Sequence, residues 1–313
     1  MRYITFGKDK DKVSQVIIGL MRIGVPDATL SVKEVAALVE TGLEEGINFL
    51  DIADCYHFGK SEEILGGAFA ENPGLRDKVF LQSKCGIVKD PDFVWFDFSK
   101  KHILEAVDAS LKRLQTDRLD CLLLHRPDAL MEPEEIAEAF TILHENGKVR
   151  NFGVSNQNPA MLELLKKYVT FPIETNQLQL SCAFTPAIDA GFHVNMQDDA
   201  AVMREGGVFE YCRLHDIVIQ AWSSLQYGYF GGVFLGSDKY PKLNAVLERI
   251  AKEQDVTPTA VALAWILRYP GRMQAVIGTT KPARVREAAR ACDVTLTKKQ
   301  WYEIYLSAGN RLP

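Results

Sequence analysis

Short apolar runs alternate with longer amphipathic segments along nearly the whole chain. The runs are rich in β-branched and aromatic residues and are bounded by polar residues, which is typical of buried parallel strands. The predicted strands cover residues 16–21, 47–51, 79–84, 119–125, 149–155, 174–180, 217–223 and 274–278. Between them, apolar residues recur at the helical period and predict helices.

The predicted helices cover residues 31–45, 61–70, 99–114, 134–145, 161–168, 207–214, 244–254, 258–268, 283–291 and 297–308. Ser31 and Glu34 have the Ser-x-x-Glu spacing of a capping box at the start of the first helix. Repetition of a strand followed by a helix predicts an α/β fold, a (β/α)8 TIM barrel, because a crossover helix joins successive parallel strands. Active-site residues are then expected on the loops at the carboxyl ends of the strands.

Composition agrees with one large domain. The chain has 313 residues, of which 47% are hydrophobic, and barrels of this kind occupy about 200 to 400 residues. No linker or low-complexity segment interrupts the alternation. We therefore expect a single domain over residues 1–313, with a short N-terminal segment before the barrel and an extra helix at the C-terminus.

Charge and cysteine content narrow the class of protein further. The net charge of −5 gives no general attraction to nucleic acid or to anionic lipid. No apolar run of about 18 residues occurs, and residues 1–12 are charged, so we expect a soluble, cytoplasmic protein without a membrane partner. The six cysteines form no Cys-x-x-Cys pair, and the irregular segment 182–201 lacks a ligand spacing, so neither disulfides nor a metal site is expected.

Three successive predicted strands end in ionisable residues, namely Asp51, Lys84 and His125, and Tyr56 follows the first of them. The phenol of a tyrosine has a pKa of about 10 in water, and a neighbouring ammonium lowers this pKa. Lys84 could therefore activate Tyr56 as a general acid while Asp51 holds the lysine and His125 orients a bound carbonyl. Each residue alone could be structural, but their joint occurrence favours a site for carbonyl reduction with hydride from a nicotinamide.

Several segments carry a resemblance to the aldo-keto reductase superfamily. They are residues 48–56, 61–66, 82–84, 123–128 and 147–156, and the first contains Asp51 with Tyr56 five residues later. Residues 125–128 and 298–301 are most similar to a bacterial branch of oxidoreductases related to the potassium-channel β-subunit group. The resemblance extends from about Gly19 to the final helix, and it implies NADPH as the cofactor and an aldehyde or ketone as the substrate.

The resemblance also implies which residues bind the nicotinamide half of the cofactor. Ser155, Asn156 and Gln177 would hydrogen-bond the carboxamide, and Trp222 would stack on the ring. The following segment, Ser223, Ser224 and Leu225, would contact the pyrophosphate, although Ser224 stands where the family usually has proline or alanine. No Gly-x-Gly-x-x-Gly motif follows a predicted strand, which argues against a Rossmann site.

The last predicted strand leads into a helix whose start is suited to phosphate. A helix N-terminus with hydroxyl groups and two cations binds phosphate through its backbone N–H groups and its dipole. By resemblance, the residues around the 2′-phosphate and the adenine are Gly278, Thr279, Thr280, Lys281, Arg284 and Glu287. This favours NADPH over NADH, but a solvated basic helix face formed with Arg286 and Arg290 is the alternative. Ala288 replaces the family's usual asparagine.

Bulky residues on the predicted rim loops are expected to line or overhang the substrate pocket. They are Met21, Arg22, His57, Trp95, Phe96, Tyr227 and Tyr229, and Met21 and Arg22 are also predicted to contact the cofactor. Such walls suit an aromatic or apolar carbonyl compound, and the glycine-rich segment 227–232 predicts a mobile loop over the cofactor. Arg126 could attract a substrate carboxylate or form a salt bridge with Asp128.

Two functions remain open at this point. The first is an NADPH-dependent carbonyl reductase with Tyr56 as general acid. The second is a cofactor-bound regulatory or redox-sensing subunit with slow turnover, as in the channel-associated relatives. The physiological substrate, the preferred direction and the oligomeric state do not follow from the sequence.

Overall fold

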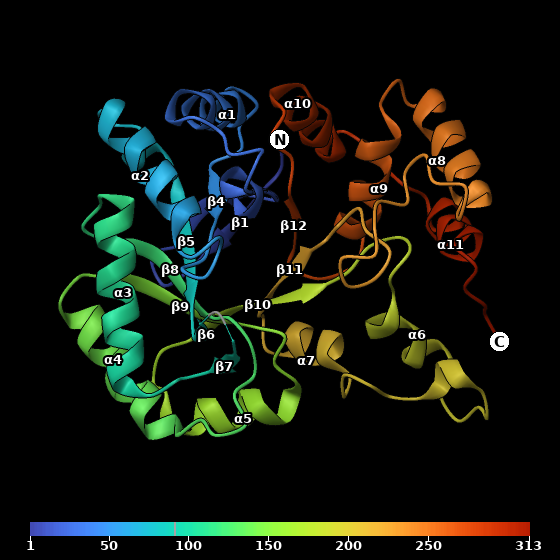
Figure 1. The fold of residues 1–313 in the computed structure, drawn as a ribbon. Helices are drawn as coiled ribbons and strands as arrows, with labels where there is room; N and C mark the ends of the chain where they lie inside the picture. The colour runs from blue at the N-terminus through green and yellow to red at the C-terminus, as the bar shows by residue number, and fades with distance from the viewer. Residues whose placement is uncertain (91) are drawn as a thin grey trace.

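The computed structural model describes residues 1–90 and 92–313, in which eight parallel strands close into a barrel (Figure 1). The strands are β3 Val16–Gly19, β4 Phe49–Asp51, β5 Phe80–Cys85, β8 Leu119–Leu124, β9 Val149–Ser155, β10 Ile173–Gln179, β11 Val218–Trp222 and β12 Met273–Ile277. They follow chain order around the barrel, and the last pairs with the first through Ala275 and Val16. The predicted (β/α)8 barrel is confirmed.

Helices surround this barrel and lie close to their predicted positions. They are α1 Val32–Glu44, α2 Lys60–Glu71, α3 Lys100–Leu114, α4 Pro133–Glu145, α5 Pro159–Tyr168, α7 Val208–Leu214, α8 Pro241–Glu253, α9 Pro258–Leu267, α10 Pro282–Ala289 and α11 Lys298–Ser307. The predicted capping box is present, because the Ser31 side chain accepts from the Glu34 N–H and the Glu34 carboxylate accepts from the Ser31 N–H. Helix α3 buries Ile103, Val107 and Leu111 on its predicted apolar face.

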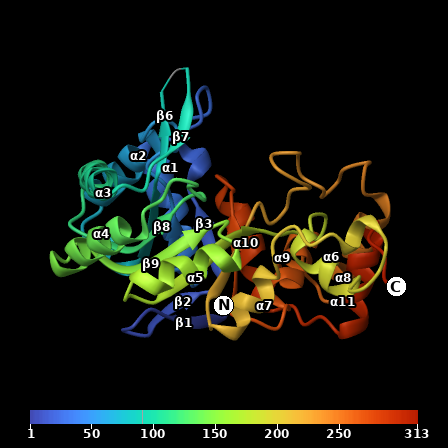
Figure 2. The same cartoon turned by 90° about the horizontal axis from the view of Figure 1, so that it is seen from below.

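Two hairpins and one helix were not predicted. The short N-terminal segment folds into a hairpin, β1 Tyr3–Phe6 with β2 Asp11–Ser14, and Phe6 packs edge-on against Phe49 and Phe80 to close the lower end of the barrel. The second hairpin, β6 Ile87–Lys89 with β7 Val94–Phe96, projects from the opposite end (Figure 2). Helix α6 Pro186–Phe192 lies within the segment that was expected to be irregular.

The C-terminal helix is fixed to the barrel by tryptophan stacking. The Trp265 ring of α9 and the Trp301 ring of α11 lie 4.8 Å apart, and each indole N–H donates to the backbone carbonyl of the other residue. Beyond α11, the Arg311 carbonyl accepts a hydrogen bond from His193, whose other ring nitrogen lies 2.9 Å from Asp198. None of the helices within residues 1–90 and 92–313 combines the length and the hydropathy that a membrane crossing requires.

Candidate active site

A buried lysine joins Asp51 to Tyr56 at the upper rim of the barrel. Asp51 is the last residue of β4, and Lys84 lies in the neighbouring strand β5. The Lys84 ammonium donates to Asp51 Oδ2 at 2.8 Å, to the Ile52 carbonyl at 2.8 Å and to the Tyr56 hydroxyl oxygen at 3.1 Å. The fully buried lysine therefore has three acceptors around it, and one of them is the phenol.

Asp51 is supported from below by glutamines that point into the barrel. Gln82 and Gln177 each donate an amide N–H to Asp51 Oδ1, at 2.7 and 2.9 Å, and both also donate to Gln220. Gln220 in turn donates to Gln274 at 3.0 Å. Our sequence reasoning missed this network, although its signal was present as polar residues inside otherwise apolar strands.

The electrostatics differ from the expectation for Tyr56. Burial raises the pKa of the Tyr56 phenol to about 12, and the opposing effect of Lys84 is too small to lower it below the ordinary value. The predicted lowering of the Tyr56 pKa is therefore wrong as a net effect. Burial alone would lower the pKa of Lys84, but Asp51 and Tyr56 raise it above its usual value, so the amine is charged. At neutral pH the site holds a protonated phenol beside an ammonium.

His125 follows β8 and faces the same phenol. Its ring centroid lies 5.6 Å from that of Tyr56 in an edge-on arrangement, and its backbone N–H donates to the Cys85 carbonyl. Burial and the positive charges of Lys84 and Arg126 hold the pKa of His125 well below its usual range. The imidazole is therefore neutral at pH 7 and carries one N–H. Its Nδ1 lies 3.6 Å from the sulfur of Cys55.

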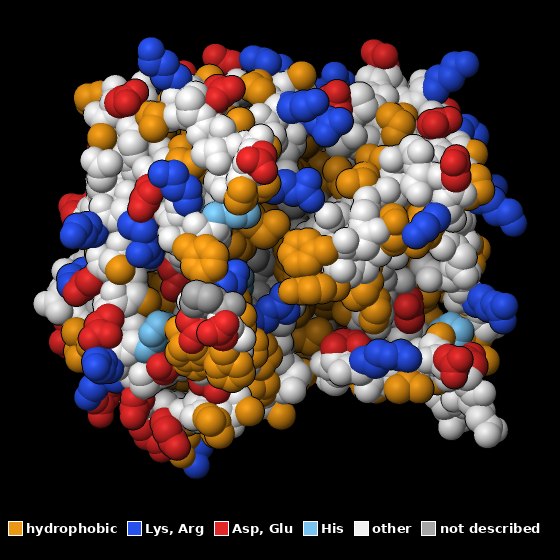
Figure 3. All heavy atoms as spheres, viewed as in Figure 1, with side chains coloured by type: hydrophobic (Ala, Val, Ile, Leu, Met, Phe, Trp, Pro, Cys, Tyr) orange, Lys and Arg blue, Asp and Glu red, His pale blue; other side chains and the backbone are white. Residues whose placement is uncertain are grey.

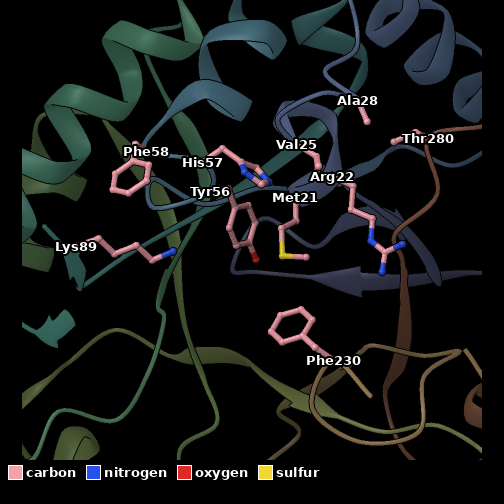
Figure 4. A pocket seen from close by; sticks show the side chains of 10 residues that line it. All are labelled: Met21, Arg22, Val25, Ala28, Tyr56, His57, Phe58, Lys89, Phe230 and Thr280. Atoms are coloured by element: carbon pink, nitrogen blue, oxygen red, sulfur yellow. The ribbon is translucent and has the colours of Figure 1, made fainter. Parts of the chain in front are cut away.

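A cavity of about 610 Å³ opens above Tyr56 (Figure 4). It is lined by Met21, Arg22, Val25, Ala28, Tyr56, His57, Phe58, Lys89, Phe230 and Thr280. Of the residues predicted for the pocket, Met21, Arg22 and His57 are among them. The lining by Phe58 and Phe230 was not predicted, and Figure 4 shows Phe230 on the side opposite Met21. His57, Phe58 and Gly59 all have positive φ, at 51°, 55° and 85°, so the chain turns tightly after the phenol.

Several exposed aromatic side chains lie on the loop segments at this end of the barrel. Hydrophobic side chains gather around the hollow in the middle of the face shown in Figure 3. Those with high exposure on the rim segments include Phe58, Phe93, Trp95, Phe96, Tyr229 and Phe230. Trp95 and Phe96 belong to β7, and Trp95 stacks on Phe93 at 5.6 Å. Neither residue lines the cavity itself, although both were predicted to line or overhang the pocket.

The Arg126 guanidinium lies beside two aromatic rings that contact each other edge-on. Its guanidinium carbon is 5.4 Å from the centre of the Trp222 ring and 5.8 Å from that of Tyr229. No hydrogen bond or salt bridge joins Arg126 to any residue in the described part of the chain, and Asp128 instead accepts from the Phe98 and Leu130 backbone N–H groups. Stacking therefore holds this cation, as cation–π contacts can.

Tyr227 does not lie in the cavity wall, contrary to expectation. Its ring packs on Tyr240 at 5.3 Å, and its hydroxyl oxygen accepts from the Lys239 ammonium at 3.2 Å. The backbone N–H of Tyr227 donates to the Gly232 carbonyl, which folds residues 227–232 into a compact loop. Tyr227 therefore supports the loop that presents Phe230 to the cavity.

The residues predicted for the nicotinamide meet at the ends of β9, β10 and β11. The Ser155 hydroxyl donates to the Gln177 carbonyl, and Asn156 donates to the Ser155 oxygen at 2.7 Å. The Trp222 indole N–H donates to Asn156 Oδ1 at 3.2 Å. Because the Gln177 amide N–H groups are used by Asp51 and Gln220, only its oxygen is left to accept from a carboxamide. This set fits a nicotinamide, with donor and acceptor atoms beside an indole face.

The segment after β11 is held mainly by its own hydrogen bonds. The Ser223 hydroxyl donates to Gln226 at 2.6 Å, and the Ser224 hydroxyl donates to the Val276 carbonyl at 2.8 Å. The Leu225 carbonyl accepts from the Phe234 N–H. The hydroxyl oxygens of both serines keep acceptor capacity only, so a pyrophosphate here would have to be bound by other donors.

The start of α10 offers cations that its own chain does not neutralise. Lys281 and Arg284 are exposed and form no ion pair with residues 1–90 or 92–313, and α10 has no side-chain cap. By contrast, Arg286 pairs with Glu44 at 3.4 Å and Arg290 with Asp293 at 2.7 Å. The alternative of a solvated charged face therefore describes Arg286 and Arg290. Lys281 and Arg284 instead suit a phosphate.

The other residues predicted near the phosphate are divided between two hollows. Thr280 lines the cavity above Tyr56, and a Cβ built on Gly278 would lie 4.0 Å from Nε of Arg22. The Thr279 hydroxyl accepts from the Lys281 N–H at 3.1 Å. Glu287 lines a separate hollow of about 600 Å³ between α10, the loop that joins α8 to α9, and the residue after α1. The cleft from Tyr56 to Thr280 thus reaches the segment just before α10 but does not include Glu287.

One group of side chains near Tyr56 has the spacing of metal ligands. The heteroatoms of Asp54, Cys55 and His125 all lie within 4.8 Å of one another. Positive charges from Lys84 and Lys89 act on the same group and oppose binding of a cation. The prediction that the site needs no metal stays a prediction.

Comparison with known proteins places the chain in a family. The model of the Aldo/keto reductase family matches residues 15–305. The chain is 38% identical to 6-dehydroglucose reductase of Agrobacterium fabrum, with 96% of each chain covered, and 32% identical to oxidoreductase YdhF of Escherichia coli, with 97% of each covered. The structure of an aldo-keto reductase from Klebsiella pneumoniae in complex with NADPH superposes with a TM-score of 0.76, at 24% identity, and covers 99% of this chain and 96% of that one.

Both the family model and the curated relatives span nearly the whole sequence. They confirm the resemblance seen in the motifs around Asp51, Tyr56, Lys84 and His125. The expectation of an NADP(H)-dependent oxidoreductase is confirmed at the level of the family. This chain belongs to the aldo/keto reductase family.

Proposed function

We propose that this protein is an NADPH-dependent carbonyl reductase in which Tyr56 is the general acid. The observation that carries the proposal is the position of the Lys84 ammonium, 2.8 Å from Asp51 and 3.1 Å from the phenol oxygen. Tyr56 also lines the cavity in which a small carbonyl compound would fit. A proton donor, its charged neighbour and the space for a substrate therefore lie together.

The cofactor would lie across the upper rim of the barrel. Ser155, Asn156 and Gln177 would hold the carboxamide beside Trp222, while Lys281 and Arg284 would bind the 2′-phosphate at the start of α10. When bound there, NADPH supplies the hydride for the carbonyl carbon. The cleft that runs from Tyr56 past Arg22 to Thr280 supports this placement.

The raised pKa of Tyr56 suits a donor that keeps its proton until it is needed. A phenol with a pKa of about 12 stays protonated at neutral pH and can transfer its proton as negative charge develops on the substrate oxygen. The Lys84 ammonium then stabilises the phenolate that remains, and Asp51 keeps the lysine in place. His125, being neutral, can donate one N–H to the same oxygen.

Replacement of the phenol tests this assignment. In Tyr56→Phe, Lys84 keeps Asp51 and the Ile52 carbonyl as acceptors, so the fold should be preserved. Turnover of 4-nitrobenzaldehyde should fall by about 10²- to 10⁴-fold, the usual contribution of a positioned acid. The NADPH Kd, measured by tryptophan fluorescence, should be unchanged. Retained turnover would contradict the role of Tyr56, and a wild-type protein without multiple turnover would favour the regulatory alternative.

Arg126 supports a more specific substrate class, an aldehyde that bears a carboxylate or several hydroxyl groups. Its guanidinium is held by Trp222 and Tyr229 without a protein acceptor in the described residues, so its N–H groups are free for a ligand. Two of the similar proteins are named 6-dehydroglucose reductase. The aromatic rim favours instead the aromatic or apolar aldehydes that the sequence suggested.

Competing substrates distinguish these classes. If Arg126 binds the polar end of the substrate, 4-carboxybenzaldehyde and 6-dehydroglucose should lose kcat/KM in Arg126→Met, while 4-nitrobenzaldehyde should not. A charge-assisted hydrogen bond contributes about 1.5–3 kcal/mol, so the loss should be roughly tenfold or more. An equal change for all three aldehydes would refute this role and leave the aromatic rim as the basis of specificity.

A further inference from the structure

Cys55 contacts His125, the catalytic candidate whose ring is not held by Asp51 or Lys84. Its sulfur lies 3.6 Å from Nδ1 of His125, and both side chains are buried. Within the described residues, no other hydrogen-bond partner of either His125 ring nitrogen is found. Cys55 precedes Tyr56 directly in the chain, so the turn that places the phenol also places this thiol.

We propose that Cys55 is a positioning residue whose S–H donates to Nδ1 of His125 and thereby holds the imidazole hydrogen on Nε2. A neutral imidazole has one N–H, and the nitrogen that accepts a hydrogen bond must be the one without hydrogen. With Nδ1 occupied by the thiol, Nε2 becomes the donor. The reverse tautomer would donate from Nδ1 to sulfur, a weak acceptor, and would leave Nε2 unable to donate to a carbonyl oxygen.

The protonation states of the two groups agree with this direction. Burial, together with the negative charge of Asp54, raises the pKa of the Cys55 thiol to about 12, so it keeps its hydrogen. Burial and the charges of Lys84, Arg126 and Lys89 lower the pKa of His125, so its ring has a free lone pair. A protonated thiol next to a neutral imidazole can form the hydrogen bond in the proposed direction.

The consequence for the reaction rests on the proposed function. The His125 ring stands edge-on to the Tyr56 ring at 5.6 Å between centroids. With hydrogen on Nε2, the imidazole and the phenol would both donate to a carbonyl oxygen bound beside them. Two neutral donors then share the charge that develops on that oxygen. If the thiol is removed, His125 is no longer restricted to the tautomer that donates.

Kinetics of matched cysteine variants test the proposal first. Cys55→Ala removes the donor, and Cys55→Ser keeps an O–H donor at the same place. Cys85→Ala is the control, because the Cys85 side chain is also buried and belongs to the hydrophobic core, while its carbonyl, which accepts from the His125 backbone N–H, is kept. We expect kcat/KM for 4-nitrobenzaldehyde to fall by about 3- to 10-fold in Cys55→Ala, the worth of one ordinary hydrogen bond. Cys55→Ser should recover most of this loss, and Cys85→Ala should resemble the wild type.

The tautomer can also be observed directly, without turnover. Long-range ¹H–¹⁵N correlation spectra of protein labelled at its six histidines, with His125 assigned from a His125→Asn variant, report which ring nitrogen carries hydrogen. We expect Nε2–H for His125 in the wild type and in Cys55→Ser, and a mixture of tautomers in Cys55→Ala. Nδ1–H in the wild type, or identical spectra in all cysteine variants, would overturn the proposal even if the protein reduces carbonyls. A protein that shows the predicted spectra but no turnover would instead contradict the proposed function.

Discussion

The pairing of Lys84 with Asp51 predicts that stability and turnover can be separated by mutation. Lys84→Met keeps an unbranched side chain that is one atom shorter, and it removes an ammonium that is fully buried and bonded to Asp51 at 2.8 Å. Removal of one partner of a buried ion pair costs about 3–5 kcal/mol, because the other charge stays in the interior. Gln82 and Gln177 still donate to the carboxylate, so a value near the lower end is expected.

The expected change in melting temperature follows from the size of the chain. At about 2.1 cal/mol/K of unfolding entropy per residue, a chain of 313 residues has about 0.66 kcal/mol/K. A loss of 3–5 kcal/mol then lowers Tm by about 5–8 °C. Turnover should be lost as well, because nothing stabilises the Tyr56 phenolate after proton transfer.

The double variant Asp51→Asn, Lys84→Met separates the two effects. Its asparagine oxygen can still accept from Gln82 and Gln177, and no buried charge remains unpaired. We expect most of the lost Tm to return in calorimetry, while turnover of 4-nitrobenzaldehyde stays low. Recovery of turnover in the double variant, or an unchanged Tm in Lys84→Met, would refute the reasoning.

A second buried ion pair, Arg76 with Asp120, provides a control in which stability is lowered without a change at the candidate active site. Arg76 lies 2.9 Å from Asp120, and both side chains are largely buried. Arg76→Met should lower Tm by a similar or smaller amount, since Arg150 also contacts Asp120 at 3.1 Å. Turnover below the melting transition should be retained, because the cavity above Tyr56 does not include this pair.

Two further predictions concern the cofactor and the C-terminal segment. Arg284→Ala should weaken NADPH binding roughly tenfold or more, as expected for a lost charge-assisted contact, with little change in the Kd of NADH. Arg286→Ala removes a cation that already pairs with Glu44 and should change neither Kd. Equal effects of the two variants would contradict the 2′-phosphate assignment. The hydrogen bond to Asp198 raises the pKa of His193, so its stabilising contribution is complete below about pH 6.5 and is lost as the pH rises through the folded value. His193→Gln should therefore increase proteolysis of the C-terminal segment at low pH and match the wild type at high pH; a difference independent of pH would exclude this linkage.

The barrel and the proximity of the four catalytic candidates could be predicted because both follow from periodicity. Parallel strands in one barrel end on one rim, so Asp51 and His125, at or just after the ends of their strands, had to lie near the residues of the neighbouring strand. Lys84, one residue before the end of β5, belongs to the same set. Tyr56 could be placed there as well, since only a short loop separates it from Asp51.

The walls of the cavity could not be predicted in the same way. Phe58 and Phe230 reach the cavity through backbone turns with positive φ, at 55° and 51°, and no hydrophobic period signals such turns. Tyr227 has the same aromatic character as Phe230 but is turned towards Tyr240 instead. Residue type on a loop therefore indicates a pocket wall, while the local backbone decides which aromatic residue forms it.

The pKa of Tyr56 shows where pairwise reasoning from sequence fails. A lysine beside a phenol lowers the phenol's pKa, and that contribution is present, but desolvation of the same phenol is larger and raises the pKa to about 12. Burial depends on every segment around Tyr56, so its effect could not be judged from the sequence.

Burial gives the site its working arrangement of charges. It keeps Tyr56 and His125 neutral and hydrogen-bearing at neutral pH, while Asp51 and Lys84 balance each other just below the phenol. Such a site binds a neutral carbonyl without displacing an existing anion, and its donors interact most strongly when the oxygen becomes negative. The same desolvation that makes Tyr56 a weak acid in the resting protein thus concentrates its effect in the transition state, where the Lys84 ammonium stabilises the phenolate as it forms.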